Sequence, residues 1–104
     1  MAGEAILKRQ VIEYLQRKKA WYEVLVTSKG RMPSGRYVTN GTPGRPDIIC
    51  FPWTSIVTVV WIETKGGGKH EDKQIEWETK AKQWGHHYVL CKKLEDLYPL
   101  FGGV

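Results

Sequence analysis

The sequence predicts an α/β fold: a central mixed sheet of four strands flanked by helices, with the elements in the order α-β-β-β-α-β. Two stretches carry apolar residues at helical spacing, and four others are apolar runs of strand length. The first three strand-like runs follow one another without a helix, which favours antiparallel pairing. A helix separates the third run from the fourth, which favours a crossover connection. The 104 residues fit one domain, residues 1–104.

The first helix is expected over residues 3–19, because Leu7, Val11 and Tyr14 form one apolar stripe with Lys and Arg opposite. Glu4 belongs to the same stripe, one turn before Leu7. An acid in the first helical turn is favoured by the helix dipole, and that explanation is about as good as a functional role. Both interpretations of Glu4 remain open at this point.

A first strand is expected over residues 21–27. The following residues, 28–46, are rich in glycine and proline and contain Lys29, Arg31 and Arg36. We expect a long loop here, and loops longer than about 12–15 residues inside a compact domain are usually functional or mobile.

The second strand, residues 46–51, begins with Pro46 and Asp47, although Asp is depleted in strands. The third strand is longer, residues 55–65, and both of its faces are apolar as far as Ile62, as in a central strand covered on both sides. Alternation puts Glu63 and Lys65 on one face at its end. An ion pair at a strand end would also explain these two residues.

The position of Asp47 favours a site. If the second and third strands are antiparallel neighbours, Asp47 and Glu63 meet at the same edge of the sheet. Two adjacent carboxylates repel each other unless a cation lies between them. Oxygen ligands favour Mg²⁺ or Mn²⁺ over zinc, and Lys65 would lie within reach of a water bound to the metal.

The remaining elements follow a glycine-rich break. A helix is expected over residues 72–84, with Gln74, Trp77 and Trp84 on one stripe and both tryptophans in the core. A fourth strand is expected over residues 86–92, followed by a short helix or turn over residues 94–101. The stretch "TKGGGKH" lacks the hydroxyl residue of a phosphate-binding loop, so no nucleotide cofactor is expected.

The formal net charge is +5, and residues 1–45 contain nine Lys and Arg against three Asp and Glu. Such a basic segment fits a nucleic acid partner as well as a solvated surface. No apolar run is long enough to span a membrane, no secretory signal is recognised, and Cys50 and Cys91 are expected to be buried free thiols of a cytoplasmic protein. The expected DNA-binding residues are Lys8, Lys29, Arg31, Arg36, Arg45 and Lys69.

Two motifs, "RPD" at residues 45–47 and "ETK" at residues 63–65, resemble those of the PD-(D/E)xK nuclease superfamily. With Glu4 and Gln74, and with the stretches "NGTPGRPD" and "IETKGGG", residues 4–92 resemble the virus-type replication-repair nuclease (VRR-NUC) domain, of the free-standing phage or bacterial type. The resemblance implies a restriction-endonuclease-like core. One departure is the start of the second long helix, where no Ser or Thr precedes Gln74 and Asp72 is a possible cap.

The resemblance also implies roles for the site residues. Asp47 and Glu63 would hold Mg²⁺ or Mn²⁺, with the Thr64 backbone carbonyl and Glu4, the latter directly or through water. Lys65 would orient the attacking water and offset phosphorane charge, and Gln74 would position Lys65, the water or a phosphate.

The implied activity is metal-dependent, structure-selective cleavage of DNA, in four-way (Holliday) junctions or other branches, by a homodimer. The dimer contacts could come from the C-terminal stretch "LYPLF" or from the face around Trp21 and Tyr22. Two alternatives stay open: a non-catalytic nucleic-acid-binding module on the same fold, and a sequence-specific restriction-type nuclease, for which 104 residues leave little room to build base-reading elements.

Overall fold

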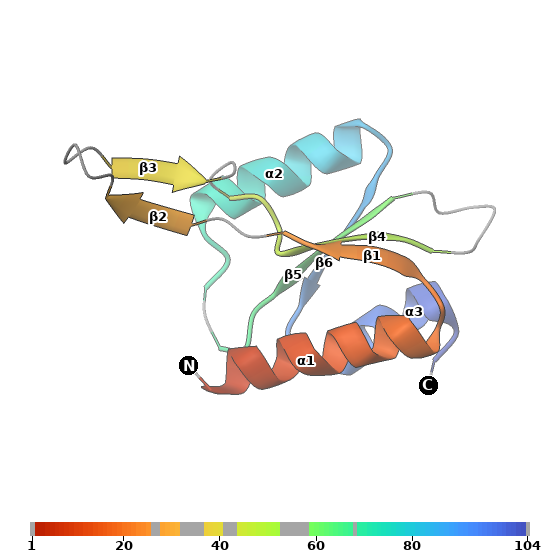
Figure 1. The fold of residues 1–104 in the computed structure, drawn as a ribbon. Coiled ribbons are helices and arrows are strands. Elements are labelled where there is room, and N and C mark those ends of the chain that lie inside the picture. Colours follow the sequence, from red (N-terminus) through yellow and green to blue (C-terminus); the bar gives the residue numbers. More distant parts are fainter. Residues whose placement is uncertain are drawn as a thin grey trace.

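A computed structural model of the chain describes residues 2–25, 28–31, 37–40, 44–52, 59–67 and 69–103. It is an α/β structure in which a four-stranded sheet is packed between helices, with a separate two-stranded ribbon projecting from it (Figure 1).

The four-stranded sheet has the strand order β1-β4-β5-β6. Its strands are β1 (Trp21–Val24), β4 (Ile48–Phe51), β5 (Val60–Thr64) and β6 (His87–Cys91). The pairs β1–β4 and β4–β5 are antiparallel, whereas β5 and β6 are parallel and joined through a helix. The predicted mixed sheet and its order of elements, with β5 in a central position, are therefore confirmed.

Helix α1 (Ala2–Arg17) covers one face of the sheet and forms the main core with it. Val11, Tyr14 and Leu15 are fully buried against strand residues such as Ile48 and Ile62. The helical stripe seen in the sequence is thus the core-facing side of α1.

The C-terminal segment packs on the same side of the sheet as α1. It consists of the 3₁₀ helix η1 (Leu94–Leu97) and the short helix α3 (Tyr98–Phe101). Leu97 is fully buried, and the rings of Tyr98 and Phe101 lie 5.6 and 5.8 Å from that of Tyr14. The apolar stretch "LYPLF" therefore packs against the core of its own chain.

Helix α2 (Asp72–Gln83) lies on the opposite face (Figure 1). Ala81 is fully buried, and Trp77 packs edge-on against Trp61 of β5, with ring centroids 5.2 Å apart. The expectation that Trp84 is a core residue is wrong: Trp84 is 57% exposed. It is the C-cap residue of α2, beyond the last turn that contacts the sheet.

The expected loop over residues 28–46 contains two strands, β2 (Ser28–Arg31) and β3 (Tyr37–Asn40). They are antiparallel, with Lys29 opposite Thr39 and Arg31 opposite Tyr37, and they form a sheet of their own. Figure 1 shows this ribbon extending beyond the N-terminal end of α2.

Two other expectations can be compared with the described residues. Cys50 and Cys91 are free and buried, as predicted. In the part of the chain that the structure describes, no helix has the length and apolar character needed to cross a bilayer.

Candidate functional site

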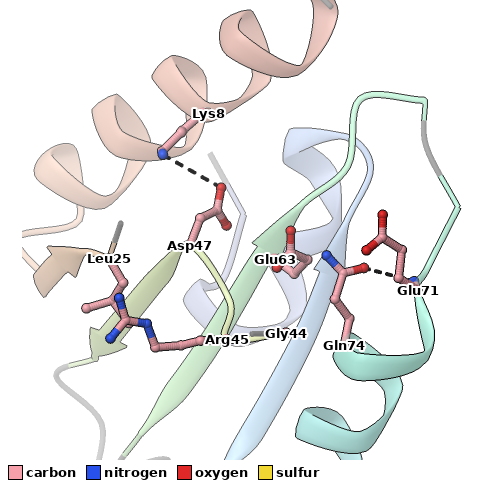
Figure 2. Close-up of a pocket in the computed structure, with 8 residues that line it drawn as sticks. All are labelled: Lys8, Leu25, Gly44, Arg45, Asp47, Glu63, Glu71 and Gln74. Atoms are coloured by element: carbon pink, nitrogen blue, oxygen red, sulfur yellow. Dashed lines mark hydrogen bonds and ion pairs between the residues drawn. The ribbon is translucent and has the colours of Figure 1, made fainter. Parts of the chain in front are cut away.

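The candidate site is a pocket of about 320 Å³ at the edge of the sheet where β4 begins and β5 ends (Figure 2). The register pairs Ile48 with Ile62, so Asp47 and Glu63 follow at adjacent positions of the two strands. The pocket is lined by residues of α1, of β5, of the start of α2 and of the chain on both sides of the β2–β3 ribbon. These residues are Lys8, Leu25, Gly44, Arg45, Asp47, Glu63, Glu71 and Gln74.

Asp47 is held by the end of β5. Its carboxylate accepts a hydrogen bond of 3.0 Å from the backbone N–H of Thr64 and a second, short bond from the Thr64 hydroxyl. Lys8 of α1 adds an ion pair, with its Nζ 3.9 Å from Asp47 Oδ2. Thr64 is fully buried, so the Asp47 carboxylate has one rigid hydrogen-bond partner and the positively charged side chain of Lys8 beside it.

Glu63 is an ionisable group in a nearly closed environment, with only 6% of the residue exposed. The pKa of its carboxyl is raised to about 8, mainly by burial and next by the charge of Asp47, whereas the charge of Lys65 acts to lower it. Glu4 and Glu71 also act to raise it. Glu63 therefore stays protonated at neutral pH unless a cation stabilises its charged form.

Glu4 and Lys65 are close enough to Glu63 to act on its charge, although neither lines the pocket. The first turn of α1 reaches the end of β5 because Gly66 has no side chain. A Cβ on Gly66 would lie 2.6 Å from the backbone nitrogen of Glu4. The glycine-rich break thus lets the two segments that carry Glu4 and Lys65 approach each other.

Gln74 enters the pocket from the first turn of α2. Its Oε1 accepts a hydrogen bond of 2.9 Å from the backbone N–H of Glu71, the N-cap residue. The helix therefore begins one residue earlier than an Asp72 cap would place it. This bond fixes the amide, and Figure 2 shows the amide nitrogen of Gln74 turned toward Glu63.

Two of the six predicted DNA-binding residues belong to this pocket. Lys8 and Arg45 line it. Lys69 is exposed in the turn before α2, while Lys29 and Arg31 belong to β2. Arg36 lies outside the described residues.

Three side chains at the site were missed in the sequence. Glu71 lines the pocket, but an acid beside a helix start has an ordinary explanation in the helix dipole. The Thr64 side chain contacts Asp47, whereas the sequence pointed only to its carbonyl. Tyr88, 3.1 Å from His70, has a pKa raised by burial and by Glu63, Glu78 and Asp47.

The donor set fits a hard divalent cation. Among the described residues, no group of three or more His, Cys, Asp or Glu side chains could hold a metal ion. Mg²⁺, however, retains several waters and needs only one or two protein carboxylates. Asp47 and Glu63 would supply two, and a bound cation would relieve the unfavourable charge on buried Glu63.

Comparison of the chain with protein-family models, with curated proteins and with solved structures found no match. The functional argument therefore depends on the pocket itself.

Proposed function

We propose that this protein is a metal-dependent DNA endonuclease that hydrolyses phosphodiester bonds in branched DNA. The observation that carries the proposal is the pairing of Asp47 with buried Glu63 at one sheet edge, in a pocket that also holds Lys8 and Arg45. A pure binding module has no need of a buried carboxyl group whose ionisation is opposed by its neighbours.

Asp47 and Glu63 would hold Mg²⁺ or Mn²⁺ directly. The Thr64 backbone carbonyl would be a further ligand, and Glu4 would act directly or through water. When bound, such a cation lowers the pKa of water and stabilises charge on a phosphate. The hydrogen bonds from Thr64 keep Asp47 oriented for this task.

The other polar groups would act on the substrate. Lys65 would orient the attacking water and offset charge on the phosphorane. Gln74, fixed by its bond to Glu71, would direct its amide N–H groups toward the water or a phosphate oxygen. Lys8 and Arg45 would bind the phosphates on either side of the scissile bond.

The proposal predicts cleavage of a labelled four-way junction in Mg²⁺ or Mn²⁺, with slower cleavage of a linear duplex of the same sequence. Asp47→Ala and Glu63→Ala should each lower the rate at least 100-fold, because each variant loses one of the two carboxylates needed to bind the cation. Denaturing gel electrophoresis of the end-labelled strands measures both rates and shows where the cuts fall.

Glu13→Gln is the matched control, since Glu13 is an exposed acid of α1 outside the pocket. This variant should cleave DNA at the same rate as the wild type. Full cleavage by Asp47→Ala and Glu63→Ala would contradict the proposal. Tight junction binding by the wild type without cleavage in either metal would instead favour a binding module.

A further inference from the structure

The ribbon β2–β3 is inserted between two neighbouring strands of the main sheet. β1 ends at Val24, which pairs with Ile48 at the start of β4, so the segment leaves and returns at adjacent positions. The two ribbon strands pair with each other in a sheet of their own, and they project from the body of the molecule (Figure 1). Two-stranded ribbons are only marginally stable in water without a surface to pack on, so a partner would stabilise this one.

The base of the ribbon belongs to the pocket. Leu25 and Gly44, at the two ends of the inserted segment, both line it. The N–H of Leu25 donates a 2.7 Å hydrogen bond to the backbone carbonyl of Asp47. Gly44, with φ of +84°, lies so close to α2 that a Cβ would be 2.4 Å from the Lys73 carbonyl oxygen. The ribbon is therefore attached to the rim of the site on both sides.

The ribbon segment is basic. Between Glu23 and Asp47 the sequence contains Lys29, Arg31, Arg36 and Arg45, and no Asp or Glu. Lys29 and Arg31 occupy alternate positions of β2, the spacing of residues on one face of a strand. A basic, acid-free segment is complementary in charge to a polyphosphate.

The dimensions of the ribbon match a groove of DNA. A strand of four residues is about 13 Å long and its partner lies about 5 Å away, and the major groove of B-form DNA, about 12 Å wide, admits a two-stranded ribbon. We propose that β2 and β3 lie in the major groove of a DNA duplex arm directly beside the pocket. This inference rests on the proposed function, which puts the scissile phosphate at Asp47 and Glu63.

The first test is binding of a fluorescent 20-base-pair DNA duplex in EDTA, so that no cleavage occurs. Lys29→Ala combined with Arg31→Ala should weaken binding at least 10-fold and should lower the slope of log K against log salt by about 2, the loss expected for two phosphate contacts. The matched control is Arg17→Ala combined with Lys80→Ala, which removes one Arg and one Lys, both exposed and outside the pocket, and should change the affinity less than threefold.

The second test distinguishes a groove from a phosphate backbone in general. The major groove of duplex RNA is too narrow and deep for a ribbon, so the ribbon variant should lose less than threefold on an RNA duplex of the same sequence. Equal losses on DNA and RNA would overturn insertion into the groove. No loss on either, with a melting temperature equal to that of the wild type, would overturn the ribbon as a DNA contact.

These outcomes separate the two proposals. A wild type that cuts junctions but binds duplex DNA no better than the ribbon variant would overturn the inference alone. A wild type that binds through Lys29 and Arg31, yet cuts no DNA in Mg²⁺ or Mn²⁺, would overturn the proposed function alone. A wild type that binds no DNA would overturn both.

Discussion

Thr64 shows how a single buried residue can set the geometry of a carboxylate. Its N–H and its hydroxyl both bond to Asp47, one to each oxygen. Each oxygen keeps further lone pairs for a cation, so the two bonds orient the carboxylate without consuming its capacity to bind. Groups that orient a metal ligand in this way commonly change metal affinity or activity 10- to 100-fold when they are removed.

Thr64→Val keeps the shape of the side chain and removes the hydroxyl. We expect cleavage to fall about 10-fold and the Mg²⁺ concentration for half-maximal rate to rise, because Asp47 loses one of its two bonds. Cleavage rates across a Mg²⁺ titration measure both effects. Thr64→Ser restores the hydroxyl and should recover most of the rate; a serine variant as slow as the valine variant would contradict this role.

Glu63 predicts an unusual dependence of stability on pH. In the folded chain without a cation it keeps its proton up to about pH 8, whereas an unfolded Glu releases it near 4.5. Between these values the folded state binds more protons than the unfolded state, so the stability that protonated Glu63 contributes is fully present below about pH 4.5 and is lost as pH rises toward 8.

The melting temperature in EDTA should therefore fall between pH 5 and pH 8 by at least about 5 °C more for the wild type than for Glu63→Gln, which has no proton to lose. Circular dichroism melts of both proteins measure the difference, and adding Mg²⁺ at pH 8 should raise the melting temperature of the wild type only. Identical pH profiles for the two proteins would contradict the buried, protonated state of Glu63.

Gly66 connects two elements, the end of β5 and the first turn of α1. Gly66→Ala would place a Cβ 2.6 Å from the Glu4 nitrogen and 2.7 Å from its Cα, both backbone atoms that cannot rotate away. We expect a loss of about 1–3 kcal/mol of stability and at least 10-fold slower cleavage, because α1 and Glu4 must move. The adjacent Gly67, which has no atom within 4 Å of its Cβ position, provides the control: Gly67→Ala should stay within about 0.5 kcal/mol of the wild type.

The elements that could be predicted are those that bury a patterned face. The apolar stripe of Val11 and Tyr14 predicted α1. The apolar run after Asp47 predicted β4, and the apolar run before Glu63 predicted β5. Antiparallel pairing of these two strands then brings the two carboxylates to adjacent positions. The ribbon could not be found in this way, because its strands do not belong to the main sheet and their sequences, "SKGR" and "YVTN", show no apolar alternation.

The missed contacts of the site depend on tertiary structure. Alternation along β5 puts Thr64 on the face opposite Glu63, which gave no reason to connect its hydroxyl with Asp47. Asp47 precedes β4 and is free to turn its carboxylate across the end of β5. The ion pair between Lys8 and Asp47 likewise depends on how α1 crosses the sheet, and no local sequence pattern predicts that crossing.

At the scale of the whole molecule, part of one sheet face is exposed among the residues that the structure describes. Trp21, at the edge strand β1, is 64% exposed and lies opposite Phe51, which is 40% exposed. The C-terminal stretch around Phe101 already packs on Tyr14, which leaves the Trp21 face as the better of the two candidate contacts. We propose that two copies pair through this face, which would provide the two active sites for a two-strand cut in branched DNA.

Light scattering at about 10 µM should then give twice the 12.0 kDa mass of the chain. Trp21→Ser combined with Phe51→Ser should give the monomer mass with a folded circular dichroism spectrum, since both side chains are exposed in the single chain. Trp84→Ser removes an equally exposed tryptophan elsewhere and should remain dimeric. A monomeric wild type at this concentration would contradict the interface.

The hydrogen bond between Leu25 and Asp47 closes the inserted segment at its base. The segment that this bond closes can change in length at little cost, since each doubling of a flexible loop adds only about 0.6 kcal/mol of closure entropy. If the proposed function and the proposed DNA contact hold, chemistry and substrate preference would reside in separate parts of the chain. Exchanging the segment for another hairpin would then change the nucleic acid that is bound while leaving the carboxylates in place.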